Sequence, residues 1–296
     1  TGMRNKTATG KKNKIARKRK YIMYKPTNIY YMITIECNQK CTKCSHWKHK
    51  DKADRLQPGK IINSIKSIQS GKELCIVGGE PLLFKSEILE ILMGIEETGI
   101  RTVIITNGVL LDKKFIDYVS NYNIHIVVSI DTIDSVFWKF VRGVNSHKNV
   151  FANLDYATSI LKPDQISIQS VLSKETRPHM ADVAKYAKSK NVYHSIQDYI
   201  SEGFEGSWVA EENKHCISPL NSQQCYAASR NLSIVQNGDV FTCFQQTWID
   251  GCQKPIGNLN NQTITEIITS EYAESVCSKM RECNLPCKVL KCNMRN

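Results

Sequence analysis

The sequence predicts an α/β fold, an open or partial barrel of six strand–helix units followed by a small cysteine-rich region. Three observations support this prediction. Six short, β-rich apolar runs lie between residues 28 and 200. Helix-like stretches separate these runs, which is typical of a parallel sheet with right-handed crossovers. The alternation stops near residue 200, and eight of the twelve cysteines lie beyond that point.

The expected strands cover residues 29–35, 74–77, 102–105, 124–130, 166–172 and 192–196. The expected helices between them cover residues 60–69, 86–98, 112–121, 148–161 and 178–189, and in 86–98 the apolar residues recur on one broad helical face. Because the strands are nearly continuous apolar runs, we expect them to be covered on both faces. The site should then lie in the loops that follow the strand C-termini.

The chain divides into four expected parts. A basic, flexible tail covers residues 1–27, the barrel 28–200, a polar linker 201–215 and a small cysteine-rich domain 216–296. In the last part, Asn237-Gly238 stands between two apolar runs, which predicts a hairpin with a two-residue turn. Residues 263–269 predict a short helix.

The net charge of +12 is concentrated in the tail. Residues 1–25 contain ten basic residues and no acidic one, so the remainder carries only +2. Such a tail is either an electrostatic arm for nucleic acid or an acidic partner, or a solvated terminus, and we favour the second. The body lacks the basic surface of a nucleic-acid binder, which argues against that partner.

The sequence predicts a cytoplasmic protein that does not enter the membrane. It contains neither an apolar run of about eighteen residues nor an apolar segment after the basic N-terminus. Twelve cysteines in tight groups, without an export signal, therefore favour metal or iron–sulfur ligation over disulfides.

The first cysteine group is Cys37-x3-Cys41-x2-Cys44, directly after the first expected strand. Three thiolates on one loop can hold three irons of a [4Fe–4S] cubane and leave the fourth iron open to an amine and a carboxylate. The alternative is a zinc site, for which His46 or His49 could supply the fourth ligand.

The motif and those that follow it resemble the radical S-adenosylmethionine (SAM) superfamily. The resemblance covers about residues 28–200 and implies a partial (β/α)6 radical SAM barrel. It implies that Cys37, Cys41 and Cys44 hold a [4Fe–4S] cluster and that SAM is cleaved reductively to a 5'-deoxyadenosyl radical, which abstracts a substrate hydrogen atom. The segments implied to bind SAM are Gly78-Gly79-Glu80-Pro81, Thr106-Asn107, Ser129 with Asp131, and Arg142.

Two of these positions carry specific expectations. Glu80 or nearby carbonyls would face the methionyl amine of SAM, and Arg142 would pair with its carboxylate. The chain departs from the family at Lys43, where an aromatic residue usually packs over the adenine. Trp47 could replace it, or Lys43 could simply face solvent.

The second cysteine group resembles the SPASM domain, or its shorter relative the twitch domain, which holds auxiliary [4Fe–4S] clusters. The family pattern implies that Cys225, Cys243 and Cys287 bind one cluster, with Cys216 as the fourth ligand. Cys277, Cys283 and Cys292 would bind a second cluster. The first cysteine of the closing pattern is replaced by Glu274, so a single auxiliary cluster remains an alternative, as do zinc knuckles.

Two cysteines lie outside these patterns. Cys75 falls within an expected strand, where packing in the core is the better interpretation. Cys252 could be a cluster ligand, a loop thiol, or a hydrogen-atom donor to a substrate radical, and Cys216 shares the last possibility if it binds no cluster.

These features predict an enzyme of peptide maturation that oxidises, crosslinks or epimerises its substrate. The first alternative is a dehydrogenase or epimerase of a small molecule such as a sugar, cyclitol or aminoglycoside. The second is a non-catalytic metal-binding scaffold. The resemblance also implies an external electron donor such as flavodoxin or ferredoxin.

Overall fold

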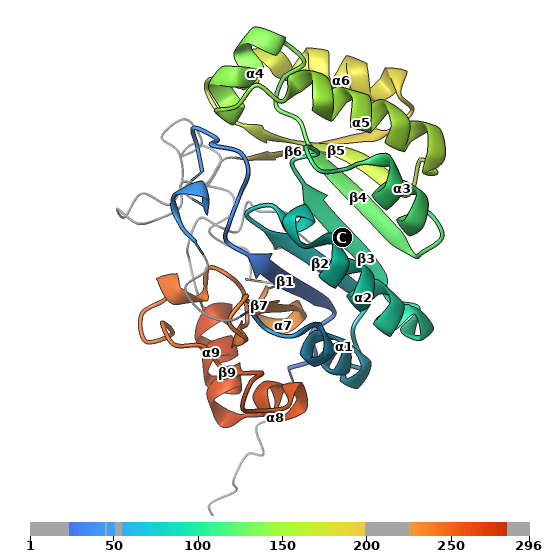
Figure 1. Cartoon of the computed structure of the whole chain (residues 1–296). Coiled ribbons are helices and arrows are strands. Elements are labelled where there is room, and N and C mark those ends of the chain that lie inside the picture. The colour runs from blue at the N-terminus through green and yellow to red at the C-terminus, as the bar shows by residue number, and fades with distance from the viewer. Residues whose placement is uncertain (1–23, 45, 51–54, 199–224, 226, 283–296) are drawn as a thin grey trace, which may run out of the picture.

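The computed structural model describes residues 24–44, 46–50, 55–198, 225 and 227–282. Most of the expected tail, the linker, and Cys216, Cys283, Cys287 and Cys292 lie outside this range. One sheet of nine strands passes through the described residues in the order β6-β5-β4-β3-β2-β1-β7-β8-β9. Figure 1 shows the sheet curving from β6 at one end to the C-terminal strands at the other.

The six predicted parallel strands are confirmed. They are β1 (Asn28–Thr34), β2 (Glu73–Gly78), β3 (Arg101–Thr106), β4 (Ile124–Ser129), β5 (Ile166–Leu172) and β6 (Tyr193–Asp198). Each pairs in parallel with the next. Their C-terminal ends therefore meet at one edge of the sheet, where the motif loops lie.

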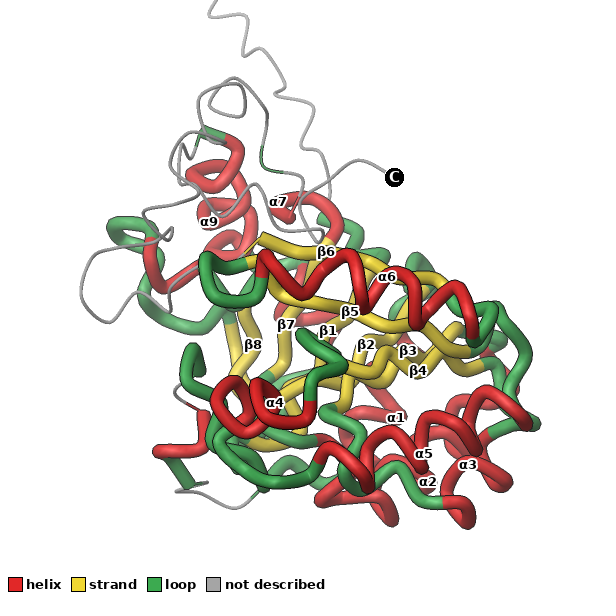
Figure 2. The backbone as a smooth tube through the Cα atoms, turned by 90° about the horizontal axis from the view of Figure 1, so that it is seen from above, coloured by secondary structure: helices red, strands yellow, loops and turns green. Residues whose placement is uncertain are grey.

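The helices cover the outer face of the curved sheet (Figure 2). They are α1 (Pro58–Ser67), α2 (Lys85–Ile95), α3 (Lys113–Val119), α4 (Ser135–Arg142), α5 (His147–Ile160) and α6 (Met180–Ser189). The 3-10 turns η1 (His46–Lys48), η2 (Pro81–Phe84), η3 (Glu96–Thr98), η4 (Arg177–His179) and η6 (Gln246–Trp248) lie in connections or at helix ends.

Helix α4 was not predicted, although its start carries a clear signal. The side chain of Asp134 caps it by accepting a hydrogen bond from Phe137 N at 2.6 Å. Asp112 caps α3 in the same way, with Phe115 N at 2.9 Å. Since α4 has only eight residues, its apolar pattern was too short to stand out.

The prediction that the strands are covered on both faces is wrong. Burial alternates along β4, where Ile124, Ile126 and Val128 are buried and the residues between them are partly exposed. The buried set packs into the core beneath the helices. The other set faces the inside of the partial barrel, where the chain leaves a cavity instead of a second helix layer.

The C-terminal region extends the barrel sheet. Strand β7 (Asn231–Ile234) pairs in parallel with β1, and β8 (Asp239–Phe241) and β9 (Gly257–Asn258) follow in antiparallel order. The helices here are α7 (Ala227–Arg230), α8 (Ile264–Ile268) and α9 (Glu271–Arg281). The predicted helix at 263–269 is confirmed as α8, and α7 and α9 were not predicted.

The hairpin is confirmed, but its predicted two-residue turn is wrong. Ile234 pairs with Val240, and Val235 N bonds to Asp239 O at 3.0 Å, so three residues form the loop. Gly238 closes it at φ +89, a left-handed conformation that favours glycine. None of the described helices has the length and apolar character that a membrane span requires.

Candidate active site

The loop after β1 carries Cys37, Cys41 and Cys44, and all three side chains are partly exposed. The loop curls back on itself, since Cys44 N donates to Cys41 O at 3.3 Å. The Trp47 indole donates to the same carbonyl at 3.1 Å. These contacts hold the last two cysteines of the motif on one compact turn.

The cysteine loop is bound to the end of α4. Lys40 N donates to Arg142 O and Thr42 N donates to Val141 O, both at 3.0 Å. Gly143 ends the helix at φ +68, and a Cβ there would lie 2.2 Å from Lys40 O. Glycine is therefore required both by conformation and by the close approach of the loop.

The Gly78-Gly79-Glu80-Pro81 segment packs beside the same loop. Gly79 N donates to Thr34 O at 2.9 Å, and Glu80 N donates to Glu36 O at 2.7 Å. A Cβ on Gly79 would lie 2.0 Å from Glu36 O, so the two backbones meet without space for a side chain. Pro81 is buried and begins η2.

The Glu80 carboxylate is fully buried and joins the ends of β2 and β3. Its Oε1 accepts from Thr106 Oγ1 at 2.7 Å and from Leu82 N at 3.0 Å, and its Oε2 accepts from Asn107 N at 2.8 Å. Burial raises the pKa of Glu80, although these hydrogen bonds oppose the rise. The carboxylate organises the turn, and its contact with an ammonium group stays a prediction.

Asn107 connects this network to the cysteines. Its Nδ2 donates to Asn38 Oδ1 at 2.7 Å and lies 3.7 Å from Cys37 Sγ. Burial raises the pKa of the Cys37 thiol above its ordinary value, and hydrogen bonds from the Gln39 backbone and the Asn107 amide oppose the rise. The amide thus favours the thiolate that iron ligation requires.

Arg142 forms a buried ion pair with Asp131, with Nη2 and Oδ2 2.8 Å apart. The same Nη2 donates to Ser129 O at 2.8 Å. Burial lowers the pKa of Arg142, but Asp131, Cys41 and Cys37 raise it, and the net pKa lies above its ordinary value. The guanidinium therefore lies close to the cluster cysteines, and its pairing with a SAM carboxylate stays a prediction.

Lys43 does not replace the expected aromatic residue. Its ammonium pairs with Glu175 at 3.1 Å, and both side chains are half-exposed. Phe137 and His179 stack with ring centroids 4.0 Å apart. This aromatic pair, which joins α4 to η4, lies outside the cysteine motif in which the aromatic residue was expected.

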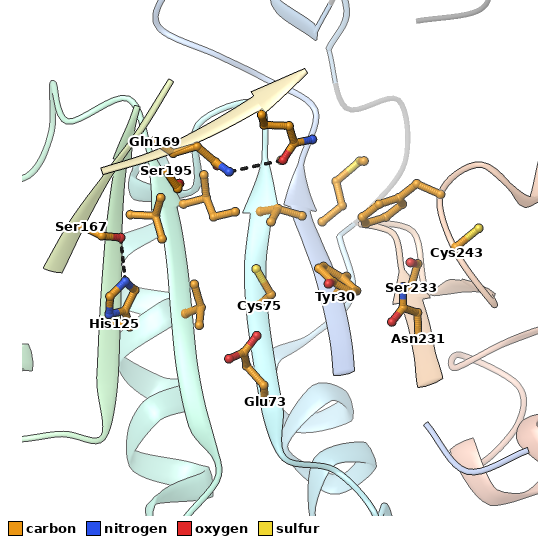
Figure 3. Close-up of a pocket in the computed structure, with 18 of the residues that line it drawn as sticks. Tyr30, Glu73, Cys75, His125, Ser167, Gln169, Ser195, Asn231, Ser233 and Cys243 are labelled. Atoms are coloured by element: carbon orange, nitrogen blue, oxygen red, sulfur yellow. Dashed lines mark hydrogen bonds between the residues drawn. The ribbon is translucent and has the colours of Figure 1, made fainter. Parts of the chain in front are cut away.

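A cavity of about 520 Å³ fills the inside of the barrel (Figure 3). The inward residues of the strands line it, including Tyr30, Glu73, Cys75, His125, Gln169 and Gln197. Cys75 is 5% exposed, so it is buried as predicted, but it also lines the cavity. His125, Ser167 and Gln169 were missed, although polar residues at every second position of a strand were the available signal.

The described cysteines of the C-terminal region are buried. They are Cys225, Cys243, Cys252 and Cys277, and none of the described cysteines forms a disulfide. Only Cys243 of these four is among the residues that line the cavity. The structure therefore gives no support to Cys252 as a hydrogen donor, and Cys216 lies outside the described residues.

The residues present fit an iron–sulfur cluster at the first loop. The three thiols share one partly exposed loop, and the buried Nε of Arg142 beside them has no hydrogen-bond partner within the described part of the chain. An anionic group would satisfy that orphaned donor. No three described His, Cys, Asp or Glu side chains converge closely enough for a single metal ion. A cubane binds each thiolate at a different corner, so its ligands lie further apart.

Comparison with known families decides the identity. The family model for the radical SAM superfamily matches residues 31–187. The chain belongs to the radical SAM superfamily. A second family model, for an iron–sulfur cluster-binding domain called SPASM, matches residues 225–293. The predicted family is confirmed, and this radical SAM enzyme uses SAM and iron–sulfur clusters as cofactors.

Curated relatives of this radical SAM enzyme have different activities. The radical SAM cyclopropyl synthase TigE of Paramaledivibacter caminithermalis is 28% identical over 190 residues, which are 55% of this chain and 39% of TigE. GTP 3',8-cyclase 1 of Mycobacterium tuberculosis is 26% identical over 189 residues, which are 60% of this chain and 52% of the cyclase. The match thus spans about half or less of the length of these relatives.

Solved structures share the fold of this radical SAM enzyme. Streptococcus suis SuiB bound to its precursor peptide SuiA has a TM-score of 0.70 at 17% identity, covering 90% of this chain and 72% of SuiB. Native anSMEcpe with AdoMet and a peptide has a TM-score of 0.62 at 16% identity, covering 87% of this chain and 88% of anSMEcpe. At these identities the likeness shows the fold alone.

Proposed function

We propose that this enzyme abstracts a hydrogen atom from a peptide held in the barrel cavity, and that the peptide is then oxidised or crosslinked. The observation that carries the proposal is the position of the cavity between the two cysteine regions. His46 and Gly78 line it beside the first loop, and Cys243 and Phe244 line it from the C-terminal region. A substrate carbon there would lie between the two regions.

The residues of the first site have separate tasks in this proposal. The cluster and SAM, when bound, supply the hydrogen-abstracting radical. Arg142 holds the carboxylate end of SAM through a charge-assisted contact, while Asp131 keeps the guanidinium in place. Glu80 and Asn107 hold the turn that faces the cysteines. An external electron donor, such as flavodoxin or ferredoxin, starts the reaction.

Oxidation is favoured over epimerisation by a predicted cluster ligand in the cavity lining. An epimerase needs a hydrogen donor beside the substrate radical; Cys252 does not line the cavity, whereas the thiol of Cys75 on β2 does. Oxidation needs an electron acceptor, and the cavity touches Cys243, a predicted auxiliary-cluster ligand. The electron of the substrate radical would therefore have a short path away from the substrate.

Side-chain amides inside the barrel support a peptide substrate. Gln169 Nε2 donates to Gln197 Oε1 at 3.3 Å across β5 and β6. Each amide retains further donors and acceptors that can bond to a peptide backbone. The peptide-bound structures of SuiB and anSMEcpe, which share this fold, are consistent with that use.

A small-molecule substrate is the second candidate, favoured by the size of the cavity. Its volume of about 520 Å³ lies within the range of about 300–1,000 Å³ of ordinary small-ligand pockets. A short peptide segment and a sugar or cyclitol would both fit such a space. The two candidate substrates therefore differ outside the cavity, since a peptide would extend beyond it and a sugar or cyclitol would not.

The test uses the anaerobically reconstituted full chain with SAM and a reductant. Substrates are any short peptide encoded beside its gene, and in parallel GTP and cyclitols. We expect 5'-deoxyadenosine together with a peptide lighter by two hydrogen atoms, observed by mass spectrometry. Turnover of a small molecule with unmodified peptide would contradict the peptide proposal. Deuterium incorporated from deuterated water without mass loss would contradict oxidation.

A further inference from the structure

The cavity inside the barrel contains one carboxylate. Glu73, the first residue of β2, lines it together with Cys75 and Val77, which share the inner face of the strand. Figure 3 shows the Glu73 side chain on β2, nearer the start of the strand than Cys75. In the lining that the described residues form, Glu73 is the only acidic residue, and neither lysine nor arginine is present. A partly buried charge is costly unless a partner compensates it.

The two residues that pair with Glu73 across the sheet are engaged elsewhere. Asn28 on β1 donates its side-chain amide to Asn231 Oδ1 at 3.3 Å. Arg101 on β3 is exposed, and its Nη2 donates to Asp164 O at 3.0 Å. Within the described part of the chain, the Glu73 carboxylate therefore forms neither a hydrogen bond nor an ion pair.

The histidine on β4 does not act as a counter-ion in the cavity. The ring nitrogens of His125 lie 2.7 Å from Asp164 O and 2.7 Å from Ser167 Oγ. A carbonyl oxygen can only accept, so Nδ1 carries the hydrogen, and the Ser167 hydroxyl can donate to Nε2. Burial lowers the pKa of His125, and the hydrogen bond to Asp164 O opposes the fall only in part. The imidazole is therefore neutral and does not compensate Glu73.

The surroundings of Glu73 suit a cation that enters from outside the chain. Burial raises the pKa of Glu73, and the charge of Arg101 opposes the rise. A second cation in contact with the carboxylate would replace the interactions with water that burial removes.

Aromatic rings lie on the neighbouring strand. Tyr30 is two residues beyond Asn28 on β1, so it faces the cavity diagonally across from Glu73. Tyr30 and Phe244 both line the cavity and make an edge contact, with ring centroids 6.2 Å apart. The faces of such rings attract ammonium and guanidinium groups, and their apolar surface packs against methylene stems. This combination of a carboxylate and aromatic rings fits the side chain of lysine or arginine.

We propose that Glu73 binds a cationic group of the substrate and so determines which substrates this enzyme accepts. The inference rests on the proposed function for the source of the cation, which is then a basic side chain of the peptide. An ammonium group donates up to three hydrogen bonds, and a guanidinium donates two in parallel to one carboxylate.

The bound cation lies away from the carbon that reacts. Glu73 begins β2 and Gly78 ends it beside the first cysteine loop, and at about 3.3 Å per residue the two are about 16 Å apart along the strand. An extended peptide covers that distance in about five residues. Glu73 is therefore a specificity-determining residue, and the basic residue of the peptide lies several positions from the residue that is modified.

The test measures equilibrium binding to the reconstituted full chain with SAM and without reductant, so that no turnover occurs. The probes are alanine pentapeptides with lysine or norleucine at the centre, because norleucine resembles the lysine stem and lacks its charge. Wild type should bind the lysine peptide about tenfold more tightly or better. Glu73→Gln should remove this preference. Glu97→Gln is the matched control, since it removes the same charge from a carboxylate paired with Lys66 outside the cavity, and it should keep the preference.

A second pair of probes, an aminocyclitol and the corresponding cyclitol, separates the source of the cation from the site. Loss of aminocyclitol binding in Glu73→Gln, with both peptides bound equally, would support the cation site and contradict the peptide substrate of the proposed function. Two results overturn the inference itself. One is a wild type that prefers neither cationic probe to its neutral counterpart, and the other is a preference that remains in Glu73→Gln. If that variant does not fold, Glu73→Thr, a neutral residue that favours strands, replaces it with the same two readings.

Discussion

The guanidinium of Arg142 and the carboxylate of Asp131 form an ion pair that is almost inaccessible to solvent, at 2.8 Å and with side-chain exposures of 8% and 9%. Asp131 also accepts a hydrogen bond from Val171 N at 2.8 Å. The pair therefore connects the end of α4, and through it the cysteine loop, to β5.

Removing one member of this pair should destabilise the protein strongly. Arg142→Ala leaves a buried carboxylate without its partner, which should lower the free energy of unfolding by about 3–5 kcal/mol. The double variant Arg142→Met with Asp131→Asn removes both charges and should cost clearly less. Denaturant unfolding of the metal-free proteins measures both. Additive losses in the double variant would show that the two charges are not coupled.

The same substitution should weaken SAM binding in the reconstituted enzyme. Losing a charge-assisted partner in a closed site costs about 2–4 kcal/mol, or roughly a 30- to 1000-fold lower affinity. Equilibrium binding of SAM to protein with full iron content gives the value. Unchanged affinity would mean that Arg142 serves the cysteine loop and not the SAM carboxylate.

Glu80 should make stability depend on pH in a defined direction. Burial raises its pKa above the ordinary value of 4.5, so the folded protein holds this proton more tightly than the unfolded chain does. The contribution of the Glu80 proton to the free energy of unfolding is therefore complete at pH values below 4.5, and it is lost as the pH rises through the raised pKa. Glu80→Gln cannot titrate there. We therefore expect the stability of wild type, relative to Glu80→Gln, to fall with rising pH in this window.

Unfolding free energies of the two proteins at several pH values between about 4 and 7 provide the measurement. A difference that stays constant with pH would mean that Glu80 titrates normally in the fold. The Gln variant should also lose the acceptor for Asn107 N, so a constant offset is expected in addition to the slope.

Two glycines provide a matched test of the contact between α4 and the cysteine loop. Gly143 and Gly99 have nearly the same φ, +68 and +65, but a Cβ at Gly143 would lie 2.2 Å from Lys40 O, whereas Gly99 faces open space. Gly99→Ala should cost about 1–2 kcal/mol from backbone strain alone. Gly143→Ala should cost more and should reduce iron at the first cluster, as measured by iron analysis. Equal losses of stability and of iron in the two variants would show that the close approach of Gly143 to Lys40 O has no specific role.

The strands and most of the helices of the barrel were predicted well because they depend on local patterns of apolar residues. β5 was predicted to the residue, and the motif loops do meet at one edge of the sheet. The polar inner face was missed because Val127 and Ile105, which also face the cavity, make the strands look apolar throughout. The apolar pattern of a segment predicts whether it forms a strand or a helix, but it does not predict which other elements cover it. The absence of a second helix layer could therefore not be predicted from the sequence.

The C-terminal cysteines show a different limit. Family spacing separated Cys252 from the ligand patterns, whereas in the structure Gln246 holds its backbone beside that of Thr242. A hydrogen bond of one buried amide to two loop segments leaves no periodic signal in a sequence. Helix α9, which carries Cys277, was not predicted, although the Ser270 side chain caps its start by accepting a hydrogen bond from Ala273 N at 3.1 Å.

The pairing of β1 with β2 on one side and β7 on the other has a consequence for electron movement. Electron tunnelling between two sites weakens steeply as their separation grows, so a pair of domains joined by a hinge would transfer charge at fluctuating rates. Here the strand that leads to Cys37 is hydrogen-bonded to β7, and β7 is hydrogen-bonded to β8, the strand that leads to Cys243. The separation between the two cysteine regions is therefore set by the ladder of one sheet, and a redox relay built on it would keep a constant span through turnover.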